Sequence, residues 1–474
     1  MAETSPILLW FRRDLRLADH PALTAACETG RPVIPVFIHD ESVEALGAAP
    51  KMRIGAGVGV LADTLAAKGS KLILRRGKAL EVLQTLIAET GAGAVWWTRC
   101  YDPEAVARDR AVKAALKDAG VDARSFGGHL MFEPWTVETG TGGFYKVYTP
   151  FWKSVRTREV EAPLPEPGRI NDPQTWPESD ALADWTMEAA MRRGADVLRG
   201  HMVVGEQAAR ERLARFINEK VARYDAARDL PAVDGTSGLS ENLAWGEISP
   251  HQCWHAGQRA MQEGAAGAET FLKELVWREF AYHLIHHTPE ITTRCWRAEW
   301  EGFPWSRDGD SDVVRLWKQG RTGMAFVDAA MREMYVTGRM HNRGRMIVAS
   351  YLTKHLMTDW RIGQAWFAEC LVDWDPASNA MGWQWAAGCG PDAAPYFRVF
   401  NPETQLKKFD PKGDYQRMWI AETARNASST ARNFFRAAPK SWRLSADEAY
   451  PFAPVVSAEE GRRIALSAYE NRDF

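Results

Sequence analysis

A short stretch, "ASNAMGWQWAAG" at residues 377–388, places a neutral amide close to two indole rings. On a helix, Asn379 and Trp383 are four residues apart and share one face. Trp385 would lie roughly 200° around the helix from Trp383. One helix could therefore present an amide and an indole to one chamber and a second indole to another, as the wall between a cofactor and a second ligand would. A core helix with two packed tryptophans would have the same spacing.

A second stretch, "FLKELVWREF" at 271–280, pairs an acid with an indole. Glu274 and Trp277 are three residues apart on one helical face, and Arg278 stands beside them. A carboxylate can accept hydrogen bonds from a polar ligand while the indole packs on a flat one. The alternative is a surface ion pair on a helix, worth about a few tenths of a kcal/mol.

A third stretch, "MHNRGRMIVAS" at 340–350, precedes the acids of "LVDWDPASN". Asn342 and Met346 share a helical face, and Arg345 could form a buried ion pair with Asp373 near a polar ligand. An ordinary salt bridge between two helices would also explain this pair.

A fourth stretch, "GTSGLSENLAWGEIS" at 235–249, gathers glycines and hydroxyl residues before a helix. Backbone N–H groups and hydroxyls in such a loop can hold a pyrophosphate. The same residues also favour a plain helix N-cap.

The first 130 residues alternate in the α/β manner. Short apolar runs at 7–11, 32–38, 71–75 and 94–98 predict buried parallel strands, and the helical stretches between them mostly end at glycine. This predicts a doubly wound parallel sheet in a domain at 1–132. No GxGxxG follows the first strand, which argues against an ordinary dinucleotide site there.

Five prolines in 160–180 indicate a linker on the surface, within an interdomain region that we place at 133–200. The remainder, 201–474, is predicted to be a large all-α domain. Its expected helices are 204–227, 268–287, 311–319, 325–337, 342–358, 362–373 and 377–387.

Composition narrows the class of protein. The 474 residues predict two or three domains, and no stretch reaches the roughly 20 apolar residues needed to span a bilayer. The N-terminus lacks a signal-peptide pattern, and six scattered cysteines form no CxxC pair, so we expect a reduced, cytoplasmic protein with no metal. A net charge of −2 does not suggest a generic polyanion binder, although a local basic groove would remain compatible with it.

Taken together and in order, these stretches resemble the photolyase/cryptochrome family. Further motifs support the resemblance, namely "LLWFRRDLRLADHPAL" (8–23), "YKVYTPFWK" (145–153), "TSGLS" (236–240), "VDAAMREM" (327–334) and "DAAPYFRVFNP" (392–402). The match is best to the class I-type, or closely related class III, enzymes that repair cyclobutane pyrimidine dimers in DNA.

The resemblance implies that the helical domain binds FAD, and that blue light drives an electron from its reduced anionic form to the dimer. Asn379 would lie beside flavin N5. Trp383, Trp360 and Trp305 would form a chain that re-reduces oxidised FAD in light. The other expected cofactor contacts are Tyr224, Thr236, Ser237, Gly238, Leu239, Ser240, Arg345, Asp373 and Asp375.

The resemblance also implies a site for UV-damaged DNA. A dimer flipped out of the duplex would meet Glu274, Trp277, Asn342, Met346 and Trp385. Phosphates would contact Arg278, Arg343 and Arg398, with Lys407 and Lys408 as further contacts. We expect a monomer with no membrane contact, whose sheet domain can hold a folate or deazaflavin antenna.

Some positions depart from the family pattern. Gly238 stands where some members have a basic residue, Ala380 and Met381 replace an asparagine and a glycine, and Arg339 stands where tryptophan is common.

Three other functions remain as alternatives. Plant-type cryptochromes, which sense light without repair, usually have an acid at the position of Asn379. Repair of the (6-4) photoproduct uses a histidine pair, whereas here His341 is followed by Asn342. A redox flavoprotein would instead act in the dark with a soluble reductant.

Overall fold

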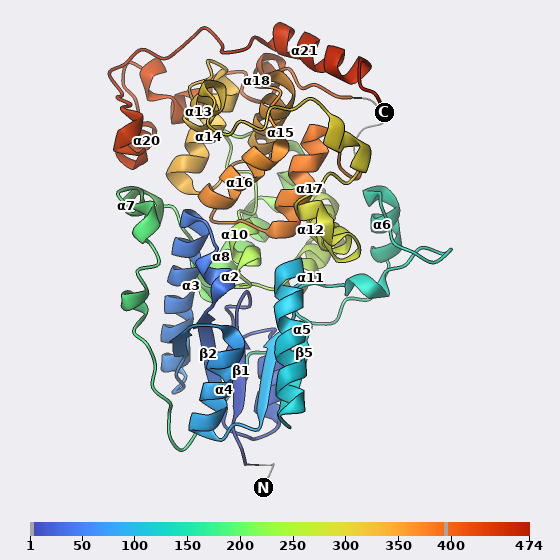
Figure 1. Cartoon of the computed structure of the whole chain (residues 1–474), viewed down its shortest axis with the longest axis vertical. Helices are drawn as coiled ribbons and strands as arrows, with labels where there is room; N and C mark the ends of the chain where they lie inside the picture. Colours follow the sequence, from blue (N-terminus) through green and yellow to red (C-terminus); the bar gives the residue numbers. More distant parts are fainter. Residues whose placement is uncertain (1–3, 393–396) are drawn as a thin grey trace.

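The computed structural model describes residues 4–392 and 397–474. A sheet domain forms the lower part of Figure 1 and a larger helical domain the upper part. The sheet has five parallel strands in the order β3-β2-β1-β4-β5. The strands are β1 (Ile7–Phe11), β2 (Val33–His39), β3 (Ile73–Arg76), β4 (Ala94–Thr98) and β5 (Asp122–Phe126).

Four of these strands match the predicted apolar runs, and the doubly wound fold is confirmed. The edge strand β5 was missed because its sequence, "DARSF", is largely polar. Helices cover both faces of the sheet: α1 (Pro21–Glu28) and α3 (Ala48–Ala67) pack against one face, and α4 (Ala79–Thr90) and α5 (Pro103–Asp118) against the other. The short α2 spans Glu41–Glu44.

The proline-rich segment has no regular secondary structure from 161 to 181, as its composition predicted. It runs along the sheet domain, where the Asp180 N–H donates to the Leu74 carbonyl at 2.9 Å and the Ser179 hydroxyl accepts from the Leu74 N–H at 2.9 Å. These bonds satisfy backbone groups of the edge strand β3, which would otherwise be open to pairing with another chain. The wider region predicted as linker does contain α6 (Tyr148–Val155) and α7 (Gly194–Arg199).

The rest of the chain is helical, as predicted. Its helices are α8 (Glu206–Glu219), α9 (Tyr224–Ala227), α10 (Ser240–Ala244), α11 (Pro250–Gln262), α12 (Ala268–His287), α13 (Asp312–Lys318), α14 (Ala325–Thr337), α15 (Asn342–Ser350), α16 (Trp360–Cys370), α17 (Pro376–Ala387), α18 (Pro402–Phe409), α19 (Asp414–Trp419), α20 (Ser429–Ala437) and α21 (Ala458–Glu470).

Two predicted helices are interrupted. The stretch 204–227 breaks after α8 into a 3₁₀ turn and α9, and 342–358 changes after α15 into a π-helical turn at Tyr351–His355. Helices α18 to α21 were not predicted one by one, because scattered aromatics and prolines hide their periodicity. Helix α17 packs against α12, α15 and α16, so it forms the centre of the helical domain.

A buried group of ion pairs joins the two domains. Arg53 of α3 contacts Glu241 at 3.2 Å and Glu247 at 2.6 Å, and all three side chains are fully buried. Glu241 also binds Arg212 of α8 and Arg339, each at 2.7 Å. Because an unpaired charge is costly inside a protein, this network fixes α3, α8, α10 and the start of α15 relative to one another.

We predict that Arg53→Met destabilises the protein by about 3–5 kcal/mol, because it leaves two buried carboxylates without their shared partner. The shift of the urea unfolding midpoint measures this loss. Arg199→Met is the matched control, since Arg199 is half exposed in its pairs with Glu188 and Asp196. The control should cost less than about 1 kcal/mol. Equal losses in the two variants would contradict the role given to the network.

Candidate active site

Helix α17 presents Asn379 as a neutral acceptor. Asp375 starts the helix by accepting a hydrogen bond from the Ser378 N–H at 2.7 Å, and it also accepts one from the Tyr282 hydroxyl. The Asn379 Nδ2 group donates to the Gln364 carbonyl at 3.1 Å. This bond fixes the amide and leaves its Oδ1 able to accept from a ligand. Asp375, by contrast, uses both oxygens to hold α17 in place.

Trp383, one helical turn beyond Asn379, packs on the same helix α16. Its ring is buried, with the Phe367 ring 4.9 Å away and the Trp317 ring 6.2 Å away, both edge-on. A Cβ atom on Gly363 would lie only 2.0 Å from the Trp383 ring, so glycine is required for this close approach. The Trp383 indole N–H is buried without an acceptor among the described residues.

Trp360 and Trp305 lie on neighbouring segments. The Ser306 N–H donates to the Met357 carbonyl at 2.7 Å, and the Asp359 N–H donates to the Ser306 carbonyl at 2.8 Å. Trp360 is fully buried and opens α16, the helix on which Trp383 packs. Trp305 is the most exposed of the three, at 9%. Trp383 thus packs on the helix that Trp360 begins, and the segment of Trp305 is hydrogen-bonded to the residues just before that helix. This arrangement is compatible with the predicted order Trp383, Trp360, Trp305.

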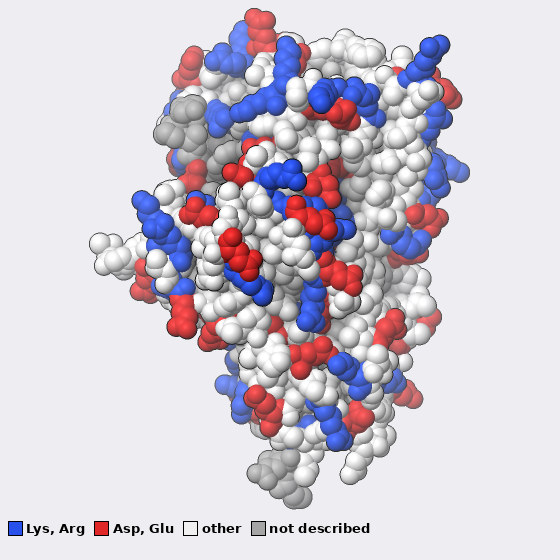
Figure 2. Space-filling model, turned by 180° about the vertical axis from the view of Figure 1, so that it is seen from behind, with Lys and Arg blue, Asp and Glu red and all other residues white. Residues whose placement is uncertain are grey.

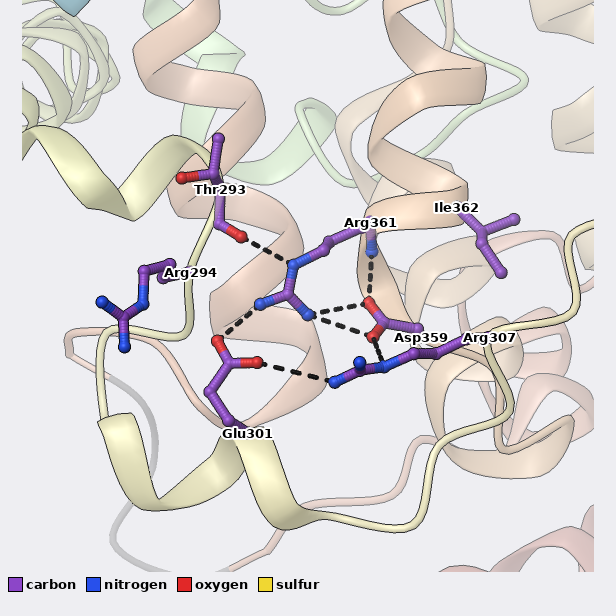
Figure 3. A pocket seen from close by; sticks show the side chains of 7 residues that line it. All are labelled: Thr293, Arg294, Glu301, Arg307, Asp359, Arg361 and Ile362. Carbon is purple, nitrogen blue, oxygen red and sulfur yellow. Dashed lines mark hydrogen bonds and ion pairs between the residues drawn. The ribbon is translucent and has the colours of Figure 1, made fainter.

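A surface hollow of about 500 Å³ lies at the start of α16 (Figure 3). Arg361 stands at its centre and forms ion pairs with Glu301 at 2.5 Å and Asp359 at 3.0 Å. Arg307 reaches the same two carboxylates at 3.8 and 3.7 Å. The other residues that line the hollow are Thr293, Arg294 and Ile362.

Helix α12 carries Glu274 and Trp277. The Trp277 ring stacks on Tyr148 of α6, with centroids 3.7 Å apart and planes 7° from parallel. Tyr148 is held by a hydrogen bond from its hydroxyl to the Lys273 carbonyl at 2.7 Å. Glu274, which is partly exposed, forms an ion pair with Arg228. No sequence pattern indicated Arg228, whereas Tyr148 belongs to the motif "YKVYTPFWK".

Helix α15 carries the third predicted group. The expected pair between Arg345 and Asp373 is present, with Nη2 of Arg345 2.7 and 3.0 Å from the two Asp373 oxygens. Asn342 is exposed and Met346 is partly exposed at the start of this helix. Burial lowers the pKa of His341 to about 4, and its neutral Nδ1 accepts from the Arg343 N–H at 3.1 Å as the helix cap. His341 is therefore committed to structure.

The loop before α10 has the geometry of an anion site. Gly238 adopts a φ of 65°. The guanidinium of Arg212 donates to the Gly238 carbonyl and, at 2.7 Å, to the Glu241 carboxylate. Within the described chain, the hydroxyls of Thr236 and Ser240 have no hydrogen-bond partner and so are available to a ligand. Leu239 is buried, and Tyr224 packs edge-on against Phe216 and Phe271. Both side chains belong to the same hydrophobic cluster.

The basic residues expected at DNA fall into two groups. Arg278 is nearly buried and donates to the His129 carbonyl at 2.8 Å, which leaves little of it for a phosphate. Arg343 is also mostly buried and pairs with Asp229 at 2.7 Å. The exposed cations are Arg398, Lys407 and Lys408.

Charge is mixed on the surface that Figure 2 shows. Lysine and arginine side chains stand beside acidic ones over most of this face, and they become more frequent toward the upper end, in the helical domain. This agrees with the net charge of −2, which argues against a uniformly basic protein.

Two absences apply to residues 4–392 and 397–474. No cluster of metal-ligating side chains is found in them. None of their helices is long and apolar enough to cross a membrane. Residues 393–396, within the quoted "DAAPYFRVFNP", lie outside the described chain.

Comparison with known proteins identifies the family. Residues 7–168 match the family model described as "DNA photolyase", and residues 271–471 match "FAD binding domain of DNA photolyase". The chain belongs to the DNA photolyase family. It is 43% identical over 472 residues to the deoxyribodipyrimidine photo-lyase of Agrobacterium fabrum, with 98% of each chain covered.

Solved structures agree with this assignment. A bacterial class III photolyase from Agrobacterium tumefaciens has a TM-score of 0.90 and 42% identity, covering 98% of this chain and 97% of that one. An archaeal photolyase from Sulfolobus tokodaii with two FAD molecules has a TM-score of 0.79 and 27% identity, covering 98% and 100%.

The residues in the helical domain fit FAD. The free hydroxyls of the loop before α10 suit a diphosphate, and the paired Arg345 and Asp373 offer both a donor and an acceptor to the rest of the cofactor. The free Oδ1 of Asn379 suits a ring N–H. These groups come from α10, α15 and α17, which the fold brings together.

Several residues that hold the expected site residues in place were not predicted from the sequence. Gln364 orients Asn379, Gly363 admits the Trp383 ring, and Arg212 holds the loop before α10. Only Gly363 left a signal, because a glycine inside a helical pattern often has a packing reason.

We predict that Gly363→Ala destabilises the protein by about 2–3 kcal/mol, because the new methyl group overlaps the Trp383 ring. Gly382→Ala on α17 is the matched control, since nothing lies within 4 Å of its Cβ position. Alanine there should be neutral or stabilising by about 0.5–1 kcal/mol. Thermal unfolding of both variants measures the difference, and equal melting temperatures would contradict the packing described here.

Proposed function

We propose that this DNA photolyase repairs cyclobutane pyrimidine dimers in DNA, using blue light absorbed by FAD in the helical domain. The observation that supports the proposal is the packing of α17, the helix of Asn379 and Trp385, against α12 and α15, which carry other expected site residues. When bound, FAD supplies the photochemistry, since its light-excited reduced form donates an electron to the dimer and its excited oxidised form accepts one.

The dimer pocket lies where α12, α15 and α17 pack together. Trp277 is already held flat by its stack on Tyr148, so little ordering cost remains when a pyrimidine packs against it. Trp385 offers a second partly buried indole, and Asn342 and Met346 complete the pocket from α15. A damaged pair stacks poorly, which makes its extrusion into such a pocket less costly.

Glu274 is the polar group of this pocket. Its carboxylate faces Arg228, and together they form a charge pair that can hydrogen-bond the pyrimidine edge. Negative charge develops on the dimer during splitting, so the Arg228 guanidinium would stabilise it while Glu274 orients the base. This role for Arg228 comes from the structure alone.

Phosphate contacts are assigned to the exposed cations. Arg398, Lys407 and Lys408 lie on the segment 397–409 and its helix α18, and none of them forms an ion pair with a described residue. Arg278 and Arg343 have partners within the protein, and we give them the supporting task of fixing α12 and α15.

We extend the proposal to a second chromophore, a folate or a deazaflavin, bound by the sheet domain. Ligands of such sheets bind where strand order reverses, here between β1 and β4. Near that point the indole N–H groups of Trp10 and Trp97 are buried without acceptors, and Arg12 lies 4.4 Å over the Trp10 ring. Mass spectrometry of the chromophores released on denaturation tests this extension.

The deciding experiment uses an oligonucleotide with one thymine dimer. Protein reduced with dithionite should restore the ultraviolet absorbance of the bases in blue light and not in the dark. A (6-4) photoproduct should stay unrepaired, because His341 caps α15 and lacks a histidine neighbour. Repair in the dark would point to a redox flavoprotein, and bound FAD without repair would point to a light sensor.

We predict that Glu274→Ala slows repair by about tenfold or more while FAD stays bound, because the pocket loses its orienting acceptor. Single-turnover flash measurements on the dimer oligonucleotide give the repair yield. Glu269→Ala is the control, since Glu269 lies on the same helix but is exposed and pairs only with Lys273. Repair by Glu274→Ala at the wild-type yield would remove Glu274 from the mechanism.

We predict that Trp383→Phe abolishes the light-driven reduction of bound oxidised FAD and spares repair by chemically reduced protein. Phenylalanine keeps an aromatic ring at this position but is far harder to oxidise than indole. The absorbance of FAD under blue light with a thiol reductant follows the reaction. Trp366→Phe on α16 should behave as wild type, and undiminished photoreduction in Trp383→Phe would show that another residue supplies the electron.

A further inference from the structure

Three polar groups lie around Trp360, the middle tryptophan of the proposed path: two contact its indole and the third is its neighbour in sequence. Its indole N–H donates to the Cys295 sulfur at 3.4 Å, and the Arg361 guanidinium lies 4.7 Å above its ring. The third group, Asp359, caps the helix that Trp360 begins. Trp383 has no hydrogen-bond acceptor, and the Trp305 N–H donates to the Thr353 carbonyl at 2.8 Å, so the three indoles differ in their surroundings.

One carboxylate holds both groups that touch the Trp360 indole. Oε1 of Glu301 accepts from the Cys295 N–H at 2.7 Å and from Nη2 of Arg361 at 2.5 Å. Figure 3 shows Glu301 below Arg361, with Asp359 on the other side of the guanidinium. Glu301 comes from a 3₁₀ turn at Ala298–Gly302, so a single side chain ties this turn to residue 295 and to α16.

The charges here act on Trp360 in opposite directions. A guanidinium is attracted to the face of a neutral indole, but it repels the ring once the ring has lost an electron. A nearby carboxylate favours the oxidised ring. Burial opposes ionisation of Glu301, yet the Cys295 N–H and Arg361 lower its pKa, so it carries the compensating negative charge near neutral pH.

We propose that Glu301 is a positioning residue for the electron path, which holds Arg361 and Cys295 against Trp360 and sets how readily that indole gives up an electron. The inference rests on the proposed path through Trp383, Trp360 and Trp305. In each event Trp360 passes one electron inward and receives one from Trp305, and a thiol reductant in solution supplies the electron that is finally consumed.

Glu301→Gln tests the charge while keeping an acceptor for the Cys295 N–H. The yield of light-driven reduction of bound FAD should fall by about fivefold or more, since less than 1.4 kcal/mol of lost stabilisation of the oxidised indole suffices. Transient absorption should show a smaller indole radical signal, a readout of the chain's own tryptophans. Glu301→Asp, which keeps the charge, should recover at least half of the wild-type yield.

Neutralising the cation instead of the carboxylate should change the yield in the opposite direction, which is a sharper test. Arg361→Gln removes the repelling cation and should raise the yield or the lifetime of the radical signal. The double variant Glu301→Gln/Arg361→Gln should return to within about twofold of wild type, because the two charge changes offset each other. Glu299→Gln is the matched control, as Glu299 is exposed on the same turn.

The outcomes separate this inference from the proposed path. An unchanged yield in Glu301→Gln, with Trp360→Phe inactive, would overturn the role of Glu301 and leave the path intact. Equal losses in Glu301→Gln and Arg361→Gln would also overturn it, since they would indicate damage to packing. An unchanged yield in Trp360→Phe would overturn both the path and the inference.

Discussion

The buried ion pairs around Glu241 are the constraint on which the molecule depends. Removing charges from water is costly, and the attraction between them offsets that cost only if every partner is in place. Arg53, Arg212 and Arg339 come from three separate parts of the chain and meet on this one carboxylate. The network therefore forms only when α3 of the sheet domain, α8, α10 and the segment before α15 are correctly assembled.

Tryptophan has several distinct uses in this protein, and the surroundings of each ring decide which. Trp383 is packed against a glycine backbone, and its N–H has no acceptor among the described residues. Trp360 contacts a thiol and a guanidinium, and Trp305 is buried with its N–H bonded to a backbone carbonyl. Trp277 is partly exposed and stacked on a tyrosine. The same residue type thus stands in a charged, ordered setting at Trp360 and in a partly exposed stack at Trp277.

Two arginines expected at DNA have partners inside the protein. Arg278 and Arg343, which resemblance placed at phosphates, have hydrogen-bonded partners on neighbouring segments and hold α12 and α15. This explains how a chain with a net charge of −2 can act on DNA, because its cations are divided between internal pairs and a few exposed positions. On this chain, electrostatic attraction to DNA would have to come from a local surface rather than from overall charge.

The sequence by itself determined the sheet domain, the helical domain and the family, because apolar runs, helical spacing and collinear motifs are local signals. It also predicted the pair of Arg345 with Asp373, since both sit in quoted motifs. Edge strand β5 and the break after α15 were not predictable from local pattern. Only the tertiary structure decided that Arg228 faces Glu274, that Gly363 admits Trp383 and that Glu301 holds the contacts of Trp360, because each joins segments far apart in sequence whose meeting depends on packing.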